Sequence, residues 1–213
     1  MSGAILQKNY HHGDLRNALI LAAASIIEES GSLSFTMADA ARRAGVSSAA
    51  PYRHFRDRDA LLEAVSQLAF YGLGEAASAA IRSTRRGSLE SIVAIGQAYL
   101  AYVVAKAPFY DLMWGDIGNR AFDPETFDRK ASGFYLLVDA VDAYLSEQGL
   151  DDTDRLDIAV KLWSQVHGLS AISMSGKLPH FHPHADVKEM LASTTRTFMT
   201  GLGIEHADSI TNA

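Results

Sequence analysis

The sequence predicts an all-helical fold. Apolar residues recur at the three- and four-residue spacing of amphipathic helices along most of the 213 positions. No segment alternates apolar and polar residues for the length of a strand, and no internal repeat is visible. Glycines and cap-forming residues fall where one periodic run stops and the next begins, so the pattern divides into separate helices.

The first two predicted helices have clear boundaries. One runs from Gly13 to Ser30, and Gly31 follows as a C-terminal stop. Thr36 and Asp39, three positions apart, match the capping-box pattern. They predict a short second helix over Met37 to Ala44.

A third helix is predicted after only a tight break. Gly45 ends the second helix, and the pair Ser47 and Ser48 offers a new N-cap. Pro51 fits this arrangement because proline is tolerated in the first turn of a helix. The third helix should end near Phe55. Helix, glycine-containing turn and helix together form the helix-turn-helix pattern, in which the second helix enters the DNA major groove.

The rest of the chain also has helical periodicity. Asp57 can cap a long helix from Arg58 to about Arg82, and the polar stretch 83–88 that follows is a break and candidate boundary. Further helices are predicted over Leu89 to Lys106, Phe109 to Trp114, Pro124 to Gln148, Asp152 to Ser175 and His184 to Leu202.

Charge and cysteine content limit the function classes. The net charge is −6, but residues 1–60 contain seven basic and six acidic residues, so the acidity belongs to the remainder. A DNA partner is therefore compatible with the composition. The absence of cysteine excludes disulfides, thiolate nucleophiles and zinc fingers. No signal peptide or run of roughly 18 apolar residues is present, so we expect a cytoplasmic protein without a membrane partner.

The third predicted helix has residue types that suit a major groove. Small residues allow close approach, serine hydroxyls meet phosphates, and alanines contact thymine methyl groups. The longer side chains reach a phosphate or a base edge. The alternative is that these residues only cap helices or fill the core. The predicted DNA-binding residues are Thr36, Ser47, Ser48, Ala49, Ala50, Pro51, Tyr52, Arg53, His54 and Arg58.

Two blocks of this sequence resemble a known family. FTMADAARRAGVSSAAPYRHFRDRDALL, residues 35–62, is similar to the DNA-binding segment of the tetracycline-repressor (TetR) family, and residues 10–16 resemble the N-terminus of one branch. In that branch the C-terminal domain has a Trp-His-Gly signature, which Trp163, His167 and Gly168 resemble.

This resemblance implies a homodimeric transcriptional repressor without enzyme activity. Residues 1–60 would form the helix-turn-helix DNA-binding domain, and residues 61–213 a helical bundle for ligand binding and dimerisation. The last two long helices would form the dimer, and a small-molecule inducer would release double-stranded operator DNA. On the helix after Asp152, a stripe of small residues independently favours close approach of a partner helix. It comprises Ser164, Gly168, Ala171 and Ser175.

The candidate inducer site is a set of aromatic and thioether residues in the middle of the chain. Such residues equally suit an ordinary core, and His167 equally suits a satisfied interior histidine. The predicted ligand-binding residues are Tyr71, Tyr99, Tyr102, Phe109, Tyr110, Met113, Trp114, Phe134, Trp163 and His167.

An enzyme is the alternative function from a different class. His180, His182, His184 and Asp186 offer metal-ligand types, which would suit a metal-dependent or histidine-based enzyme. Their proline-bearing segment equally suits a solvated loop, and the sequence has no phosphate loop, nucleophile elbow or paired-carboxylate motif. A scaffold bundle would leave the capped turn before Tyr52 unexplained. We therefore expect no cofactor and no metal.

Overall fold

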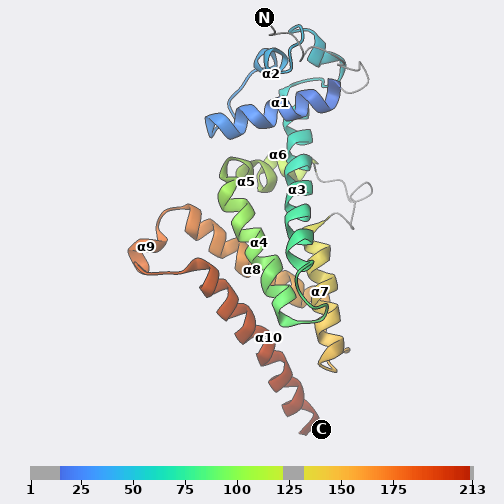
Figure 1. Ribbon diagram of the computed structural model, residues 1–213, viewed down its shortest axis with the longest axis vertical. Helices are drawn as coiled ribbons and strands as arrows, with labels where there is room; N and C mark the ends of the chain where they lie inside the picture. The colour runs from blue at the N-terminus through green and yellow to red at the C-terminus, as the bar shows by residue number, and fades with distance from the viewer. Residues whose placement is uncertain (1–14, 122–131, 212–213) are drawn as a thin grey trace, which may run out of the picture. The chain divides into compact units, whose positions relative to one another are not determined.

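The structure is a computed structural model that describes residues 15–121 and 132–211, with side chains as far as Leu202 in the last helix (Figure 1). Within these residues all regular structure is helical, which confirms the predicted fold class. Contacts group the chain into two units. Unit 1 comprises Met1–Ala69 and Pro108–Asp123, and unit 2 comprises Phe70–Ala107 and Pro124–Ala213.

Unit 1 contains the predicted helix-turn-helix. Its elements are α1 (Leu15–Ser30), α2 (Met37–Arg43), the 3₁₀ turn η1 (Ala50–Arg53), the first half of α3 (Arg58–Ile81), most of α5 (Ala107–Trp114) and α6 (Asp116–Ala121). Apolar residues at helical spacing on α1 and on α3 are buried in the core of this unit, as the periodicity predicts. These buried side chains include Leu19, Ile27, Leu61, Leu62 and Val65.

The helix boundaries in unit 1 follow from the predicted caps. The Thr36 side chain accepts from the Asp39 backbone N–H, and the Asp39 carboxylate accepts from the Thr36 backbone N–H, which confirms the capping box. Gly31 and Gly45 both have positive φ, 65° and 71°, a conformation that glycine adopts without a Cβ penalty. The Asp57 carboxylate accepts from the Ala60 N–H at 2.8 Å and caps α3.

The predicted third helix is shorter than its sequence pattern indicates. Only residues 50–53 form a 3₁₀ turn, whose N-cap is Ala49 and which has no side-chain cap. The prediction that Ser47 and Ser48 cap a helix was wrong. A backbone turn takes that place, because the Ala50 N–H donates to the Ser47 carbonyl oxygen at 3.0 Å and both serine side chains stay exposed.

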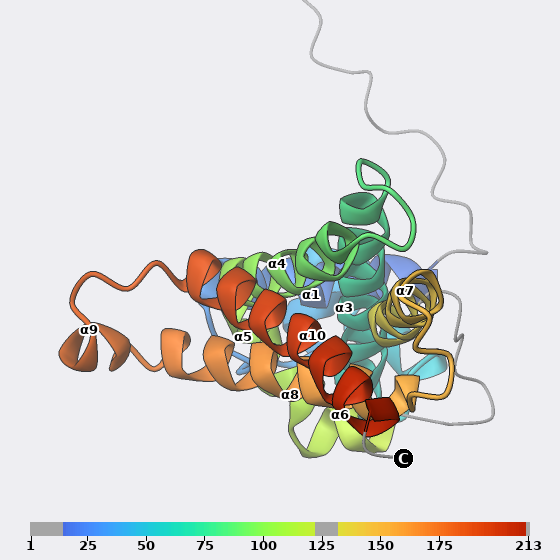
Figure 2. The same ribbon diagram turned by 90° about the horizontal axis from the view of Figure 1, so that it is seen from below.

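Unit 2 is a helical bundle centred on α4. It contains the second half of α3, α4 (Leu89–Ala105), α7 (Gly133–Glu147), α8 (Arg155–Met174), α9 (Leu178–Phe181) and α10 (Val187–Thr211). α4 packs against α7, α8 and α10, and α8 also packs against α7 and α10. Two views show α9 standing away from the other helices of this unit (Figures 1 and 2). The buried core residues include Ile92, Ile95, Val141, Ile158, Leu162 and Met199.

In unit 2, α4 and α8 agree with the predicted helices to within three residues at both ends. α7 ends one residue before the predicted end at Gln148. It begins only at Gly133, because Ser132 has extended backbone, so the predicted helix start at Pro124 was wrong for this helix; positions 124–131 lie outside the described residues. The last helix continues past the predicted end at Leu202 to Thr211. Two short helices, α6 in unit 1 and α9 in unit 2, were not predicted. Each is too short for a periodic pattern.

Candidate functional site

The segment after Gly45 presents polar side chains on the surface of unit 1. Six of the predicted DNA-binding residues are exposed along it: Ser47, Ser48, Ala49, Tyr52, Arg53 and His54. Tyr52 is the clearest case, because a large aromatic side chain that is 58% exposed makes little contribution to the core. Thr36, at the start of α2, is also exposed. We call residues 47–54 the recognition segment.

Three of the predicted DNA-binding residues are placed differently. Pro51 is buried, so its side chain packs inside unit 1, and Ala50 is half-buried. The Arg58 guanidinium lies 5.3 Å from the centre of the Phe35 ring and donates to the Leu33 carbonyl oxygen. These contacts anchor Arg58 within the unit, although 37% of its side chain stays exposed. The recognition segment is thus anchored in unit 1 through the buried Pro51.

Most arginines near the recognition segment are paired with acidic side chains. Arg42 pairs with Asp39, and Arg43 Nη1 donates to Glu29 Oε1 at 2.6 Å. The hydrogen bonds from Arg43 and Ser25 lower the pKa of Glu29 to about 2. The pKa of Asp39 is lowered mainly by the hydrogen bond from the Thr36 hydroxyl. These carboxylates therefore stay ionised, and Arg42 and Arg43 form ion pairs within unit 1.

Arg53 differs from these arginines. It is exposed at the end of η1, and among the described acidic residues none forms an ion pair with it. The neighbouring Arg56 donates to Asp57 at 3.0 Å. Arg53 therefore gives the recognition segment a cation that the described acidic residues leave without an ion pair.

Unit 2 brings together four of the predicted ligand-binding residues. The Tyr99 hydroxyl lies 2.8 Å from His167 Nδ1, joining α4 to α8. The Trp163 ring is 5.6 Å from the His167 ring, and the Phe134 ring packs edge-on against Trp163 at 6.1 Å. Burial lowers the pKa of His167, so its imidazole is neutral at pH 7. The cluster offers apolar ring surface around one polar pair.

The other predicted ligand-binding residues differ in burial and in the unit to which they belong. Tyr102 packs against Gly72, where an added Cβ would lie 2.6 Å from its hydroxyl oxygen. Tyr71 is 55% exposed. Phe109, Tyr110, Met113 and Trp114 belong to unit 1, where Phe109 and Met113 are buried. A ligand-binding role for these residues remains a prediction.

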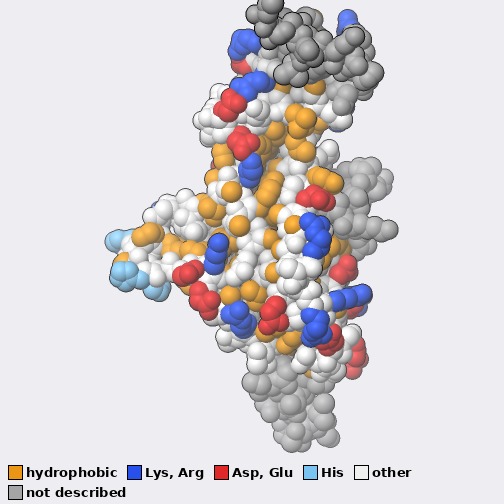
Figure 3. Space-filling view, viewed as in Figure 1, with side chains coloured by type: hydrophobic (Ala, Val, Ile, Leu, Met, Phe, Trp, Pro, Cys, Tyr) orange, Lys and Arg blue, Asp and Glu red, His pale blue; other side chains and the backbone are white. Residues whose placement is uncertain are grey.

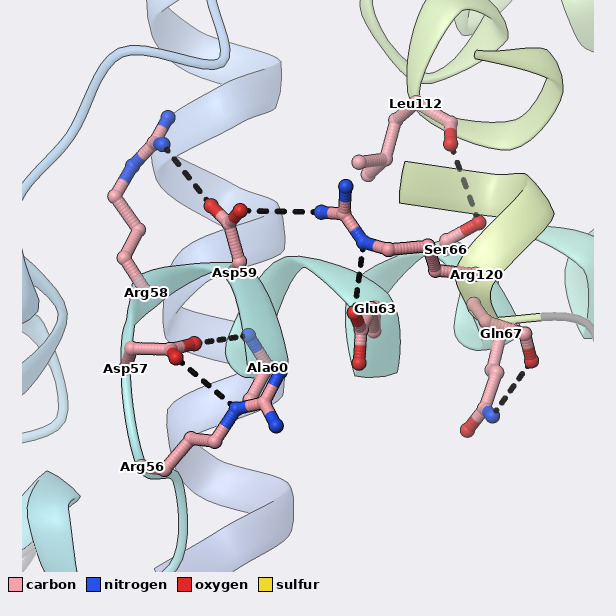
Figure 4. A network of polar contacts seen from close by, with 11 residues as sticks. Arg56, Asp57, Arg58, Asp59, Ala60, Glu63, Ser66, Gln67, Leu112 and Arg120 are labelled. Atoms are coloured by element: carbon pink, nitrogen blue, oxygen red, sulfur yellow. Dashed lines mark hydrogen bonds and ion pairs between the residues drawn. The ribbon is translucent and has the colours of Figure 1, made fainter. Parts of the chain in front are cut away.

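One polar network was missed by sequence reasoning. Arg120 on α6 lies between two carboxylates of α3, 3.1 Å from Asp59 Oδ2 and 3.3 Å from Glu63 Oε1 (Figure 4). Asp59 and Glu63 are four positions apart and share one face of the helix. This spacing marks a paired acidic face, but the sequence contains no signal that selects an arginine about 60 positions away.

The histidine-rich segment between α8 and α10 is exposed. His180, His182 and His184 gather around α9 on the surface (Figure 3). Among the described residues, no group of three or more histidine and carboxylate side chains has an arrangement that could hold a metal ion.

The helices were predicted to lie in a protein without a membrane partner. None of the described helices alone combines the length and apolar content needed to cross a membrane. One bent pair, Leu89–Ala105 with Ala107–Trp114, meets those criteria jointly.

Comparisons with known proteins agree with this arrangement. Residues 19–65 match the family model described as "Bacterial regulatory proteins, tetR family". Residues 92–198 match the model described as "Tetracyclin repressor-like, C-terminal domain". A search of curated proteins gives no significant match.

Solved structures share the fold. A protein of unknown function from Rhodococcus sp. RHA1 is 28% identical, with a TM-score of 0.73 over 92% of this chain and 100% of that chain. A TetR family transcription regulator from Marinobacter aquaeolei VT8 is 16% identical, with a TM-score of 0.60 over 86% and 95%. The fatty acid degradation regulator FadR from Bacillus halodurans is 13% identical, with a TM-score of 0.58 over 89% and 95%.

The two family models together span the recognition segment and the α4–α8–α10 bundle. Proteins of this family are transcription regulators and, in general, not enzymes. The chain therefore belongs to the TetR family of ligand-responsive, DNA-binding transcriptional regulators.

Proposed function

We propose that this chain acts as a homodimeric repressor that binds operator DNA through one recognition segment from each copy. The observation that carries the proposal is the exposed row of Ser47, Tyr52, Arg53 and His54 on a segment anchored by buried Pro51. Hydroxyl, phenol, imidazole and guanidinium groups are the side chains that contact phosphates and base edges. Thr36, at the exposed N-terminus of α2, would add a phosphate contact.

The proposed dimer uses the outer faces of α8 and α10. Leu156, Val160 and Ile172 on α8 are 49%, 44% and 49% exposed, although each is a large apolar side chain. Glycines lie inside both helices, Gly168 in α8 and Gly201 in α10, and a Cβ at either position would meet nothing within 4 Å.

These glycines support close approach by a second copy. A glycine inside a helix costs roughly 0.5–1 kcal/mol relative to alanine. Among the described residues of this chain, no neighbour lies so close that these two positions must be glycine. A second copy packed against the small-residue face of α8 would explain the glycine, since backbones approach closely only where side chains are small. Such a two-fold dimer sets two recognition segments about one DNA turn, roughly 34 Å, apart.

The proposed inducer site is the cluster of Tyr99, Phe134, Trp163 and His167. Its ring surfaces suit an apolar or planar molecule, and its tyrosine–histidine pair offers one polar contact. Binding there would change the spacing of the two recognition segments and release the DNA.

DNA binding tests the proposal first. Purified protein is titrated by fluorescence anisotropy against the duplex upstream of its own gene and against an unrelated duplex, at two salt concentrations. Tight binding that prefers the upstream duplex and weakens steeply with salt supports the proposal. Equal, weak binding to both duplexes contradicts it.

Sedimentation tests the dimer with the variant Gly168→Ala. If α8 faces solvent, alanine raises helix stability by about 0.5–1 kcal/mol and leaves the molecular mass unchanged. If α8 faces a second copy, the added methyl weakens the dimer, by an expected tenfold or more. A matched control is Ala171→Gly on the same face, which removes a methyl group instead. A monomeric wild-type chain at micromolar concentration would contradict the dimer.

A further inference from the structure

The segment from Pro108 to Ala121, which we call the α5–α6 segment, is held along one face of α3. Arg120 contacts Asp59 and Glu63, as described above, and Ser66 and Gln67 both continue that side of α3 about one turn beyond Glu63 (Figure 4). The Ser66 hydroxyl donates to the Leu112 carbonyl oxygen at 3.4 Å, and Gln67 Nε2 donates to the Ala121 carbonyl oxygen at 3.3 Å. Ser66 is completely buried.

The corner between α5 and α6 is tightly packed around Gly118. Gly118 is buried, and a Cβ there would overlap the carbonyl oxygen of Met113 and lie 2.8 Å from that of Leu112. Any other residue would have to displace backbone at the end of α5. The corner is therefore tight, and it aims Arg120 at the first turns of α3.

The first turns of α3 are also connected to the residues that contact DNA in the proposed function, Thr36 and the recognition segment. Asp59 lies 3.8 Å from Arg58, whose guanidinium holds the Leu33 carbonyl oxygen and the Phe35 ring. Phe35 directly precedes Thr36, the cap of α2. On the other side, α3 begins five residues after Arg53, the end of η1. The start of α3 thus connects α2, the recognition segment and Arg120.

The family models divide the chain differently. The tetR-family model matches residues 19–65, and the C-terminal-domain model matches residues 92–198, which include the α5–α6 segment. Contacts instead group Pro108–Asp123 with Met1–Ala69. The DNA-binding unit of this chain is discontinuous in sequence.

We propose that the α5–α6 segment is a working part of the DNA-binding unit and that Arg120 is a positioning residue for the recognition segment. The proposal rests on the proposed function. Arg120 acts by fixing the first two turns of α3 through Asp59 and Glu63, and it makes no contact with DNA. A planar guanidinium suits this task because it holds two carboxylates in a fixed geometry.

The test compares Arg120→Gln with Arg85→Gln in the full-length chain, using the anisotropy assay with the upstream duplex. Arg85 is a matched control because it also holds a carboxylate, that of Glu147 at 2.6 Å, but in unit 2. Both variants remove one positive charge. We expect Arg120→Gln to lose roughly five- to tenfold in affinity and Arg85→Gln less than twofold.

A second variant, Glu63→Gln, separates positioning from simple electrostatics. Removing an acidic charge would by itself strengthen DNA binding, whereas loss of the contact to Arg120 weakens it. We expect weaker binding, and we expect the double variant to bind no worse than Arg120→Gln alone, because both changes break the same contact. Stronger binding by Glu63→Gln would overturn the proposal.

The salt dependence distinguishes positioning from a direct phosphate contact. A lost phosphate contact lowers the slope of log affinity against log salt by about 0.9, whereas a positioning residue leaves the slope unchanged. A slope lowered by that amount in Arg120→Gln would overturn the positioning role. Circular dichroism melts of each variant confirm that binding is measured on folded protein.

The outcomes also separate this proposal from the one it rests on. A wild-type chain that binds both duplexes equally overturns the proposed function and the role of Arg120 with it. A wild-type chain that prefers the upstream duplex, with Arg120→Gln equal to it within twofold, overturns only the role of Arg120.

Discussion

The Tyr99 hydroxyl and His167 Nδ1 lie 2.8 Å apart although 68 positions separate the two residues. The bond joins α4 to α8 inside unit 2. Tyr99→Phe keeps the ring and removes the hydroxyl, so it removes this bond without opening a cavity. We expect the variant to lose about 1 kcal/mol of unfolding free energy, measured by urea denaturation.

Tyr71→Phe is the control for that measurement. It removes the same hydroxyl from a ring that is 55% exposed, so we expect a change within about 0.5 kcal/mol. Equal losses in both variants would show that the Tyr99–His167 bond adds nothing to stability.

His167 makes stability depend on pH near neutrality. Burial lowers its pKa in the folded state below the ordinary 6.5. As pH falls below 6.5 the unfolded chain binds a proton that the folded chain does not, so stability falls until the lowered pKa is passed. His167→Gln removes this contribution and leaves the other seven histidines. Unfolding free energies between pH 8 and 5 should therefore fall less steeply in the variant, and parallel curves would contradict the prediction.

The Glu29–Arg43 pair also makes stability fall with falling pH, here through protonation of a carboxylate at lower pH. The bonds from Arg43 and Ser25 lower the pKa of Glu29 from 4.5 to about 2, so its stabilising effect is complete above pH 4.5 and is lost as pH falls toward 2. We expect Glu29→Gln to melt below wild type at pH 7 and the gap to close on acidification. In an Arg43→Gln background the same change should have a smaller effect, because only the Ser25 bond remains, and an undiminished gap there would exclude Arg43 as the main cause.

Thr36 has two separable roles, as the cap of α2 and as a proposed phosphate contact. Thr36→Ala removes the hydroxyl that accepts from the Asp39 backbone N–H and caps α2, and it should cost about 1 kcal/mol of stability. Thr36→Ser keeps a hydroxyl and should cost little. If Thr36 also contacts phosphate, DNA affinity measured by anisotropy falls for Thr36→Ala and stays within about twofold for Thr36→Ser. Equal stability of the two variants would argue against the cap.

Tyr52 tests the recognition segment directly. Because its ring is exposed, Tyr52→Ala should leave the melting temperature nearly unchanged. A lost phosphate contact carries little sequence information, so we expect weaker binding to both duplexes. Wild-type affinity in this variant would remove Tyr52 from the interface.

The sequence predicted what depends on neighbouring residues. The capping box at Thr36, the stop at Gly45 and the Asp57 cap each rest on contacts within four positions, so their residue types alone indicate them. The recognition segment shows the limit of this reasoning. Serines before a proline match a helix start, yet a backbone turn satisfies the same groups and only one 3₁₀ turn forms.

Contacts between distant residues were beyond the sequence pattern. Arg120 reaches Asp59 across 61 positions, and no local rule selects that partner. The aromatic residues were assigned to one ligand set because they share a type. The division into units then placed Met113 and Trp114 in unit 1 and His167 in unit 2. Residue type predicts burial, but only the fold decides which buried residues meet.

The anchoring of the recognition segment has a consequence for how such regulators diverge. Between Ser47 and Phe55, the buried side chains are those of Pro51 and Phe55, while six of the remaining residues are exposed. Substitutions at exposed positions usually change stability by less than about 0.5 kcal/mol. Operator preference can therefore drift at these positions by single mutations, each of which leaves a folded protein. A duplicated gene could acquire a new set of target promoters without passing through an unstable intermediate.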